Sequence, residues 1–382
     1  MSKPQILEGS RAIALTIKNI RPAVISAYPI TPQTHIVEDL ARFKAEGIAD
    51  YELLRAESEF AAASIVLGAS ASGVRTYTST SSQGLLLMTE VIYNIAGMQL
   101  PIVITCANRA IGAPINIWND QQDIMSVRDA GWLSFFAENH QEAVFQHLLA
   151  YKIAEKISVP AFVNVDGFVL THSYEEVSIP EEKNIKKFLP DYKPKNGTYL
   201  DPANPRSLGT LVTPTHYQEM RLELNQKILD SKELIKSEWI KLQKIFNPQE
   251  KNISSYDNGL VEYYGPTKAK TVVISLGSVI GTIKETIDEE NKKSGVFKNK
   301  TGVLKLRTFR PFPAEEILAV IKKTNAKKII VLEKSISLGL GGILETEVKS
   351  ALYGKTTAII NGVVVGLGGK DITKENLRKI IK

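Results

Sequence analysis

Two short segments near the N-terminus combine residue types that could do chemistry. In AYPITPQT, residues 27–34, two prolines frame the hydroxyl of Thr31. Each proline fixes its own φ at about −65° and biases the residue before it toward an extended conformation. The segment RAESEFAAAS then places two carboxylates, Glu57 and Glu59, at the start of an Ala-rich stretch. A hydroxyl with little freedom and a carboxylate at the mouth of an apolar helix could both serve a ligand.

Both features also have a structural interpretation. Thr31 could instead be the N-cap of a helix over Gln33–Ala45, and the residues alone do not decide between cap and ligand contact. Glu57 and Glu59 are two residues apart, so they cannot share one face of a helix. One would cap the helix that follows while the other faces inward, and by itself the sequence favours the cap. The low charge of residues 59–73 predicts a helix buried on nearly all sides.

A third segment has the layout of an anion-binding turn. In RTYTSTSSQGLLLMTE, residues 75–90, a hydroxyl-rich strand runs through a Ser-Ser-Gln-Gly turn into an apolar helix. Such a turn points backbone N–H groups at an anion or a polar ring. The known phosphate-loop spacings are absent, so the signal is weak.

Arg109 follows the buried strand Pro101–Ala107 and opens the loop IGAPINIWNDQQD. An arginine at the carboxyl end of a parallel strand is well placed to bind a carboxylate with two hydrogen bonds. A salt bridge to Asp120 or Asp123 is the equally supported alternative. His172, in the loop after the strand Pro160–Asp166, fits a structural histidine better than a catalytic one.

The elements that would position these side chains alternate between strand and helix as far as Asp166. This alternation predicts an α/β fold with a doubly wound parallel sheet, whose ligands bind beyond the carboxyl ends of the strands. An extended arm over 181–214, a long charged helix over 219–246 and a linker over 247–258 follow. From Gly259 a smaller α/β domain is expected, with strands in TVVISLGS, GVLKLRTFRPFP, KKIIVLEKS and TTAIINGVVVGL.

Composition sets further bounds. The 382 residues carry a net charge of +6, which comes largely from Lys-rich segments interleaved with acids. No aromatic interleaving or recognition motif accompanies these segments, so no nucleic-acid partner is expected. The single cysteine, Cys106, lies in a strand-like run and is interpreted as a buried core residue, which rules out an iron-sulfur cluster held by this chain alone. No signal peptide or membrane-spanning run is seen, so a cytoplasmic protein without a membrane partner is expected.

Five motifs in order resemble one known family. The YPITP turn, the ESE-plus-Ala helix, the SSQGLLLM turn, the NRA…PINIWNDQQD loop and the VDGFVLTH segment are similar to those of the alpha subunit of 2-oxoacid:ferredoxin oxidoreductases, above all the pyruvate type, pyruvate synthase. The resemblance is dense over 9–180 and looser through the second domain. It implies a pyrimidine-binding domain for thiamine diphosphate over residues 1–248 and a transketolase C-terminal-like domain over residues 257–382.

The resemblance also assigns roles to single residues. Glu59 resembles the glutamate that hydrogen-bonds N1′ of the aminopyrimidine ring, with Pro29 and Ile30 beside the cofactor. Thr31 and Arg109 resemble the residues that contact the carbonyl and carboxylate of the 2-oxoacid. Glu57 then keeps the capping role.

What the chain lacks points to partners. The GDG…N pattern that holds magnesium and the diphosphate in this superfamily is absent, because Asp166-Gly167 has no such continuation. A beta subunit would supply Mg²⁺ and the diphosphate site, gamma and delta subunits of ferredoxin type would supply [4Fe-4S] clusters, and ferredoxin and coenzyme A would be co-substrates. The implied reaction is the reversible oxidative decarboxylation of pyruvate to acyl-CoA. A branched-chain 2-oxoacid as substrate and a non-catalytic scaffold are the alternatives.

Overall fold

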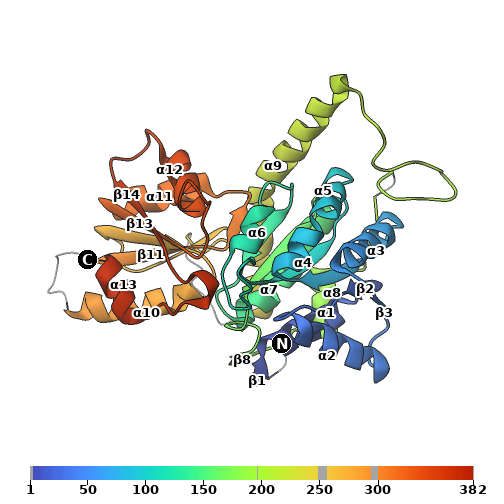
Figure 1. The fold of residues 1–382 in the computed structure, drawn as a ribbon, viewed down its shortest axis with the longest axis horizontal. Helices are drawn as coiled ribbons and strands as arrows, with labels where there is room; N and C mark the ends of the chain where they lie inside the picture. The colour runs from blue at the N-terminus through green and yellow to red at the C-terminus, as the bar shows by residue number, and fades with distance from the viewer. Residues whose placement is uncertain (1–2, 196, 248–255, 294–299, 382) are drawn as a thin grey trace.

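The structure is a computed structural model that describes residues 3–195, 197–247, 256–293 and 300–381. It contains two larger sheets, each with helices packed against it, which lie side by side in Figure 1. The blue-to-green N-terminal part carries the larger sheet and the orange-to-red part the smaller one.

The larger sheet has seven strands in the order β12-β6-β7-β5-β4-β2-β3. Every neighbouring pair from β6 to β3 is parallel, which confirms the predicted parallel sheet. The middle strands are short apolar or hydroxyl-rich runs that are fully buried, as expected for a sheet covered on both faces. The strands are β2 (Val24–Ala27), β3 (Glu52–Arg55), β4 (Thr76–Thr80), β5 (Val103–Asn108), β6 (Leu133–Phe136), β7 (Ala161–Asp166) and β12 (Thr308–Arg310).

Helices cover both faces of this sheet, so it is doubly wound. One group packs together around α1 and α7, and the other around α3. The chain passes from β2 to β3 toward one edge of the sheet and then from β3 to β4 in the opposite direction. Because both crossovers are right-handed, the two groups of helices lie on opposite faces. The first group is α1 (Gly9–Ile20), α2 (Thr34–Ala45), α7 (His140–Ile157), α8 (Glu182–Phe188) and α9 (Pro214–Phe246), and the second is α3 (Glu59–Ala71), α4 (Ser82–Leu87), α5 (Thr89–Gly97) and α6 (Gln122–Ser126).

Two features extend from this part of the molecule. A two-stranded antiparallel sheet joins β1 (Gln5–Glu8) to β8 (Tyr174–Val177). The arm predicted over 181–214 begins instead with helix α8, and the described residues between α8 and α9 form its extended part. Helix α9 projects beyond the body of the molecule at the top of Figure 1. Among the residues described, no helix is both long and apolar enough to cross a membrane.

The smaller sheet has five strands in the order β14-β13-β10-β11-β9, and only β9 is antiparallel. Its strands are β9 (Val261–Tyr264), β10 (Thr271–Ser275), β11 (Thr301–Leu306), β13 (Lys328–Glu333) and β14 (Ile359–Val364), and its helices are α10 (Val279–Lys293), α11 (Ala314–Thr324), α12 (Ile343–Leu352), the 3₁₀ turn η1 (Leu367–Gly369) and α13 (Lys374–Ile381). The four predicted strand segments are present, and β9 was missed.

The segment GVLKLRTFRPFP does not form one strand, as the sequence had predicted. It divides at Arg307 into β11, in the smaller sheet, and β12, which pairs antiparallel with β6 in the larger sheet. Arg307 is buried at the bend and binds carboxylates from both parts of the chain, and Phe309 packs edge-on against Phe136. Tertiary contacts across the two sheets therefore override the local strand pattern.

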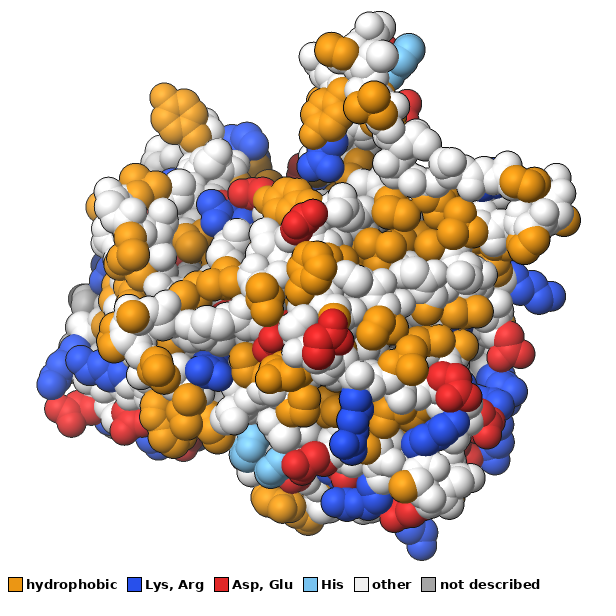
Figure 2. Space-filling view, turned by 45° about the vertical axis from the view of Figure 1, so that its right-hand side comes forward, with side chains coloured by type: hydrophobic (Ala, Val, Ile, Leu, Met, Phe, Trp, Pro, Cys, Tyr) orange, Lys and Arg blue, Asp and Glu red, His pale blue; other side chains and the backbone are white. Residues whose placement is uncertain are grey.

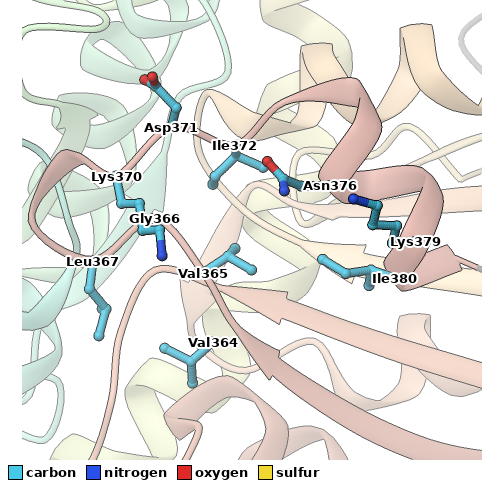
Figure 3. Close-up of a pocket in the computed structure, with 10 residues that line it drawn as sticks. All are labelled: Val364, Val365, Gly366, Leu367, Lys370, Asp371, Ile372, Asn376, Lys379 and Ile380. Atoms are coloured by element: carbon cyan, nitrogen blue, oxygen red, sulfur yellow. The ribbon is translucent and has the colours of Figure 1, made fainter.

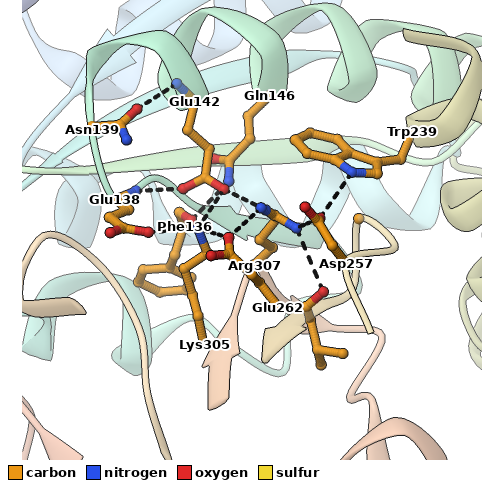
Figure 4. Close-up of polar contacts among 12 residues, drawn as sticks. Phe136, Glu138, Asn139, Glu142, Gln146, Trp239, Asp257, Glu262, Lys305 and Arg307 are labelled. Atoms are coloured by element: carbon orange, nitrogen blue, oxygen red, sulfur yellow. Dashed lines mark hydrogen bonds and ion pairs between the residues drawn. The ribbon is translucent and has the colours of Figure 1, made fainter. Parts of the chain in front are cut away.

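The seam between the sheets holds a buried charge cluster, shown in Figure 4. Lys305 lies within 2.6 Å of Glu138, 3.0 Å of Glu142 and 2.6 Å of Glu262. Arg307 pairs with Glu142, Glu262 and Asp257, and its guanidinium lies 4.5 Å from the ring centroid of Trp239 on α9. The division into residues 1–248 and 257–382 stays a prediction, because residues 248–255 of the expected linker lie outside the described part.

Candidate active site

The predicted site residues meet at one edge of the larger sheet. Four neighbouring strands, β3, β2, β4 and β5, run parallel, so their carboxyl ends lie side by side. Glu59 follows β3, Thr31 follows β2, the Ser81-Ser82 turn follows β4 and Arg109 follows β5. The strand order reverses at this point, which is where open α/β sheets bind ligands.

Glu59 is the first residue of α3 and is only 7% exposed. The N-cap is Ser58, whose hydroxyl oxygen accepts a hydrogen bond from the backbone N–H of Ala61 at 3.1 Å. Glu57 is exposed and does not cap the helix, so the capping role predicted for it is wrong. Because the serine already satisfies the helix end, the Glu59 carboxylate is not needed there.

The Glu59 side chain lies against the first turn of α4. A Cβ atom on Gly84 would lie 2.6 Å from Oε1 of Glu59 and 2.6 Å from Oγ1 of Thr80, so only glycine fits at residue 84. In the described part of the chain, the Glu59 carboxylate has neither a hydrogen bond nor an ion pair. The buried hydroxyl of Thr80 likewise has no hydrogen-bond partner among the residues that the structure describes. A nearly buried carboxylate of this kind is placed to accept a hydrogen bond from a group outside the described residues.

Helix α3 is not buried on all sides, contrary to the sequence-based expectation. Its buried residues are Glu59, Ala62, Ala63, Val66, Ser70 and Ala71. Phe60 is exposed, as are Tyr28, Leu87 and Trp118 from neighbouring segments. In Figure 2 hydrophobic side chains spread over the face turned to the viewer, and charged ones gather mainly toward its lower margin. The small residues of α3 therefore lie beside an apolar surface rather than wholly within the core.

The YPITP turn lies at the surface beyond β2. Thr31 is exposed and is not the N-cap of α2, which begins at Thr34 after Gln33. Gln33 is fully buried and holds the turn: its Nε2 donates to the carbonyl oxygens of Tyr28 at 3.1 Å and Ser79 at 2.9 Å. Sequence reasoning missed this residue, although a polar residue between a proline and an apolar helix was a possible signal.

Arg109 connects the turn to the next strand. Its Nη1 donates to the backbone oxygen of Thr31 at 2.9 Å, and its Nε donates to that of Asn116 at 3.0 Å. The guanidinium is half-buried, and among the described residues it makes no ion pair, so the alternative of a salt bridge to Asp120 or Asp123 is wrong. Nη2 has no partner in that part of the chain. The structure thus brings together Thr31 and Arg109, both predicted to contact the substrate.

Asp123 is the anchor that the sequence analysis did not assign. It is fully buried and accepts hydrogen bonds from the backbone N–H groups of Ser82 at 3.0 Å and Arg109 at 2.9 Å, and from Nδ2 of Asn108 at 3.1 Å. Burial raises the pKa of Asp123 to about 6, although these hydrogen bonds act in the opposite direction. Its carboxylate therefore fixes the start of α4 and the end of β5 relative to each other.

The predicted anion-binding turn is satisfied from within the chain. The Ser82 N–H points at an anion, as expected, and that anion is the carboxylate of Asp123. Ser82 has a φ of +47°, which is unusual for a residue other than glycine. Its side-chain oxygen donates to the carbonyl of Ala110, so the turn is held from two sides. Cys106, on the neighbouring strand β5, is fully buried as predicted, and burial raises the pKa of its thiol.

The NDQQD segment, residues 119–123, links the larger sheet to the smaller sheet through hydrogen bonds. Asp120 accepts from the backbone N–H of Gly368 at 3.0 Å, in the turn after β14. Gln121 donates to Asp166 at 2.9 Å, and Asp166 pairs with Lys334, at the end of β13. Although burial raises the pKa of Asp166, Lys334 and the hydrogen bonds bring it below its ordinary value. Asp166 is thus engaged by the chain's own cation.

A separate hollow lies at the carboxyl edge of the smaller sheet, shown in Figure 3. Its volume is about 420 Å³, and it is lined by Val364, Val365, Gly366, Leu367, Lys370, Asp371, Ile372, Asn376, Lys379 and Ile380. The predicted site residues do not line it.

Known proteins are similar to this chain along its full length. The family model for pyruvate flavodoxin/ferredoxin oxidoreductase, thiamine diphosphate-binding, matches residues 16–238, and that for pyruvate:ferredoxin oxidoreductase core domain II matches residues 269–377. Pyruvate synthase subunit PorA of Methanosarcina barkeri is 43% identical over 100% of this chain and 92% of its own length. Ketoisovalerate oxidoreductase subunit VorA of Pyrococcus horikoshii is 39% identical over 98% and 92%.

One solved structure has the same fold. The 2-oxoglutarate:ferredoxin oxidoreductase from Magnetococcus marinus, with 2-oxoglutarate, coenzyme A and succinyl-CoA bound, superposes with a TM-score of 0.72 at 20% identity. The match covers 100% of this chain and 66% of that longer chain.

Proposed function

Since the chain belongs to the pyruvate flavodoxin/ferredoxin oxidoreductase family, we propose that it is the alpha subunit of a pyruvate:ferredoxin oxidoreductase. The proposed reaction is the reversible oxidative decarboxylation of pyruvate, or a related 2-oxoacid, to acyl-CoA and CO₂, with ferredoxin as electron acceptor. The chain acts only with partner subunits.

The observation that carries this proposal is the setting of Glu59. A carboxylate that is 7% exposed, lacks a partner in the described part of the chain and abuts Gly84 fits a heterocyclic ligand with a ring nitrogen to offer. Glu59 would hydrogen-bond N1′ of the aminopyrimidine of thiamine diphosphate, with Pro29 and Ile30 on the rim of the same site. Bound there, thiamine diphosphate would supply the nucleophilic carbon and the electron sink that decarboxylation of a 2-oxoacid needs.

Arg109 and Thr31 are proposed to receive the substrate. The guanidinium keeps Nη2 available while Nε and Nη1 hold it in place, and the charge of an arginine persists at all physiological pH values. A 2-oxoacid carboxylate is a suitable acceptor for it, and the exposed Thr31 hydroxyl is available to the neighbouring carbonyl. Fixing the substrate in this way lowers the entropic part of the barrier.

The rest of the site would come from other chains. Asp166 is engaged by Lys334, and Cys106 is buried and is the single cysteine of the chain. We therefore assign Mg²⁺ and the diphosphate to a beta subunit, and [4Fe-4S] clusters to gamma and delta subunits. The exposed apolar residues in the segments that follow β2, β3, β4 and β5, namely Tyr28, Phe60, Leu87, Ile115 and Trp118, support a partner chain at this edge of the sheet.

Pyruvate is the preferred substrate in this proposal. The 43% identity to a pyruvate synthase subunit exceeds the 39% identity to a ketoisovalerate oxidoreductase subunit by a small margin. A branched-chain 2-oxoacid is therefore the second candidate, and a substrate panel on the reconstituted complex separates the two. A scaffold role does not account for a nearly buried Glu59 carboxylate that lacks a partner among the described residues.

Glu59→Gln in the reconstituted complex tests the function. The amide retains the size of the side chain but cannot exchange a proton at N1′, so ferredoxin reduction with pyruvate should fall by at least about 100-fold. The matched control is Glu57→Gln, two residues away and exposed, which should retain the wild-type rate. A Glu59→Gln complex that reduces ferredoxin at the wild-type rate would contradict the assignment.

A further inference from the structure

Three side chains that can bind a metal converge beside the two-stranded sheet. Glu8 ends β1, His35 lies in the first turn of α2, and His172 lies in the turn that precedes β8. One potential ligand atom from each lies within 4.8 Å of the other two. Oε1 of Glu8 is 2.7 Å from Nδ1 of His35, and the rings of His35 and His172 have centroids 4.5 Å apart.

The backbone holds these side chains in place. Glu8 pairs with Tyr174 across the β1-β8 sheet, and the next two backbone N–H groups, of Gly9 and Ser10, donate to Ser173 and Thr171 at 3.2 and 3.0 Å. The three ligand-bearing segments are far apart in the sequence, so only the fold brings them together.

The ring of His172 is oriented before any ligand arrives. Its Nδ1 lies 2.7 Å from the hydroxyl of the buried Thr171, which also accepts from the backbone N–H of Phe168 at 2.8 Å. The ring of His172 contacts two other rings, that of Phe168, with centroids 4.8 Å apart, and that of His35. Nε2 of His172 has no hydrogen-bond partner among the described residues. Metal-binding histidines are typically held in this way by their other ring nitrogen.

We propose that Glu8, His35 and His172 form a binding site for a divalent transition-metal ion, with Zn²⁺ the best match. Two imidazole nitrogens and one carboxylate oxygen are a donor set that Zn²⁺ accepts, whereas Mg²⁺ and Ca²⁺ prefer oxygen ligands throughout. The three residues are half-buried, so water can fill the fourth position.

The bound ion would join β1, α2 and the turn over 167–173 into one unit. That turn also touches the YPITP segment, because a Cβ atom on Gly167 would lie 2.7 Å from Cγ of Pro32. The site would therefore stiffen the segment that carries Thr31. It does not depend on the proposed function, since neither Glu59 nor Arg109 belongs to it.

Isothermal titration of the full chain tests the proposal. The untagged protein is stripped with a chelator and titrated with ZnCl₂, and one equivalent of Zn²⁺ should bind. Glu8→Gln, His35→Gln and His172→Gln should each weaken the affinity at least about tenfold. The matched control is His216→Gln, a histidine on the exposed part of α9, which should bind as the wild type does.

A second measurement does not depend on the variants folding. Co²⁺ added to the stripped wild-type chain should give visible absorption bands of a low-coordinate nitrogen and oxygen site, and Zn²⁺ should displace them. Failure of the wild type to bind one equivalent of Zn²⁺ would overturn the proposal and leave a Glu8–His35 hydrogen bond beside the tilted ring of His172. Binding unaffected by the three variants would overturn it as well, because the ion would then lie elsewhere.

Discussion

Arg109 holds the fold together, and we propose that it also binds the substrate. Two of its nitrogens hold the loop that follows β5 and the turn that follows β2, and in the proposed function Nη2 donates to a substrate carboxylate. Burial lowers the pKa of the guanidinium, and the Asp123 charge opposes this shift. The residue nevertheless stays charged, because arginine is not deprotonated in proteins.

Arg109→Ala should raise the KM for pyruvate in the reconstituted complex by about 10- to 100-fold. A hydrogen bond to a charged group contributes about 1.5–3 kcal/mol, which corresponds to this range. Arg109→Lys should recover only part of the affinity, because an ammonium lacks the planar fork. The control is Arg42→Ala on the exposed face of α2, and an unchanged KM in Arg109→Ala would remove this residue from the carboxylate.

Asp123 acts on elements. Its carboxylate accepts hydrogen bonds from the first turn of α4 and from the end of β5. The first turn of α4 lies against Glu59, so Asp123 fixes the position of that turn relative to Arg109. It is a positioning residue, since the contacts it makes are with the chain itself.

Asp123→Asn should leave two N–H donors without an acceptor in either orientation of the amide. These are the backbone N–H groups of Ser82 and Arg109, which share Oδ2, or the donors of Asn108 and Ile124, which share Oδ1. A buried donor without a partner costs about 1–3 kcal/mol, so urea unfolding should show a stability loss of at least that size. In the complex, kcat should fall by more than the loss of folded protein accounts for, because the two site elements move relative to each other. Asp50→Asn, at an 82% exposed side chain, is the control. A stability loss with wild-type kcat would limit Asp123 to a structural role.

The whole molecule is joined across the seam by β12 and by the charge cluster around Lys305 and Arg307 (Figure 4). Burial raises the pKa values of Glu142 and Glu262, but the neighbouring Lys305 and Arg307 outweigh it and bring both below the ordinary value of 4.5. At these two carboxylates the folded chain therefore binds fewer protons than the unfolded chain in mildly acid solution. The stabilisation of the fold by these two charged carboxylates is present above pH 4.5 and is lost as the pH falls below that value.

Glu262→Gln should lower stability at pH 7 by about 3–5 kcal/mol, because it leaves buried cations short of a partner. It should also flatten the acid side of the stability curve, since one depressed carboxylate is gone. Urea unfolding between pH 7 and about 3.5 measures both effects. Glu219→Gln, exposed on α9, is the control, and parallel curves for Glu262→Gln and the wild type would contradict the prediction.

The sequence by itself determined the α/β class, the parallel order of the larger sheet and the family. It also placed the predicted site residues after strands whose carboxyl ends proved to be neighbours. These features follow from local patterns: strand-helix alternation fixes the layers, and prolines and small residues mark the turns. The roles of Glu59, Thr31, Arg109, Pro29 and Ile30 remain predictions, because the contacts that would decide them belong to ligands and partner chains.

Only the tertiary structure decided which carboxylate serves which group. Ser58 rather than Glu57 caps α3, Asp123 occupies the predicted anion-binding turn, and the NDQQD segment ties the two sheets together. The strand division at Arg307 belongs here as well. The Ser58 cap is a local contact between residues three apart, but the partners of Asp123 and of the NDQQD segment are groups 14 to more than 200 residues away. Hydrogen-bond partners at such separations are fixed by the packing of whole elements, which residue spacing does not encode.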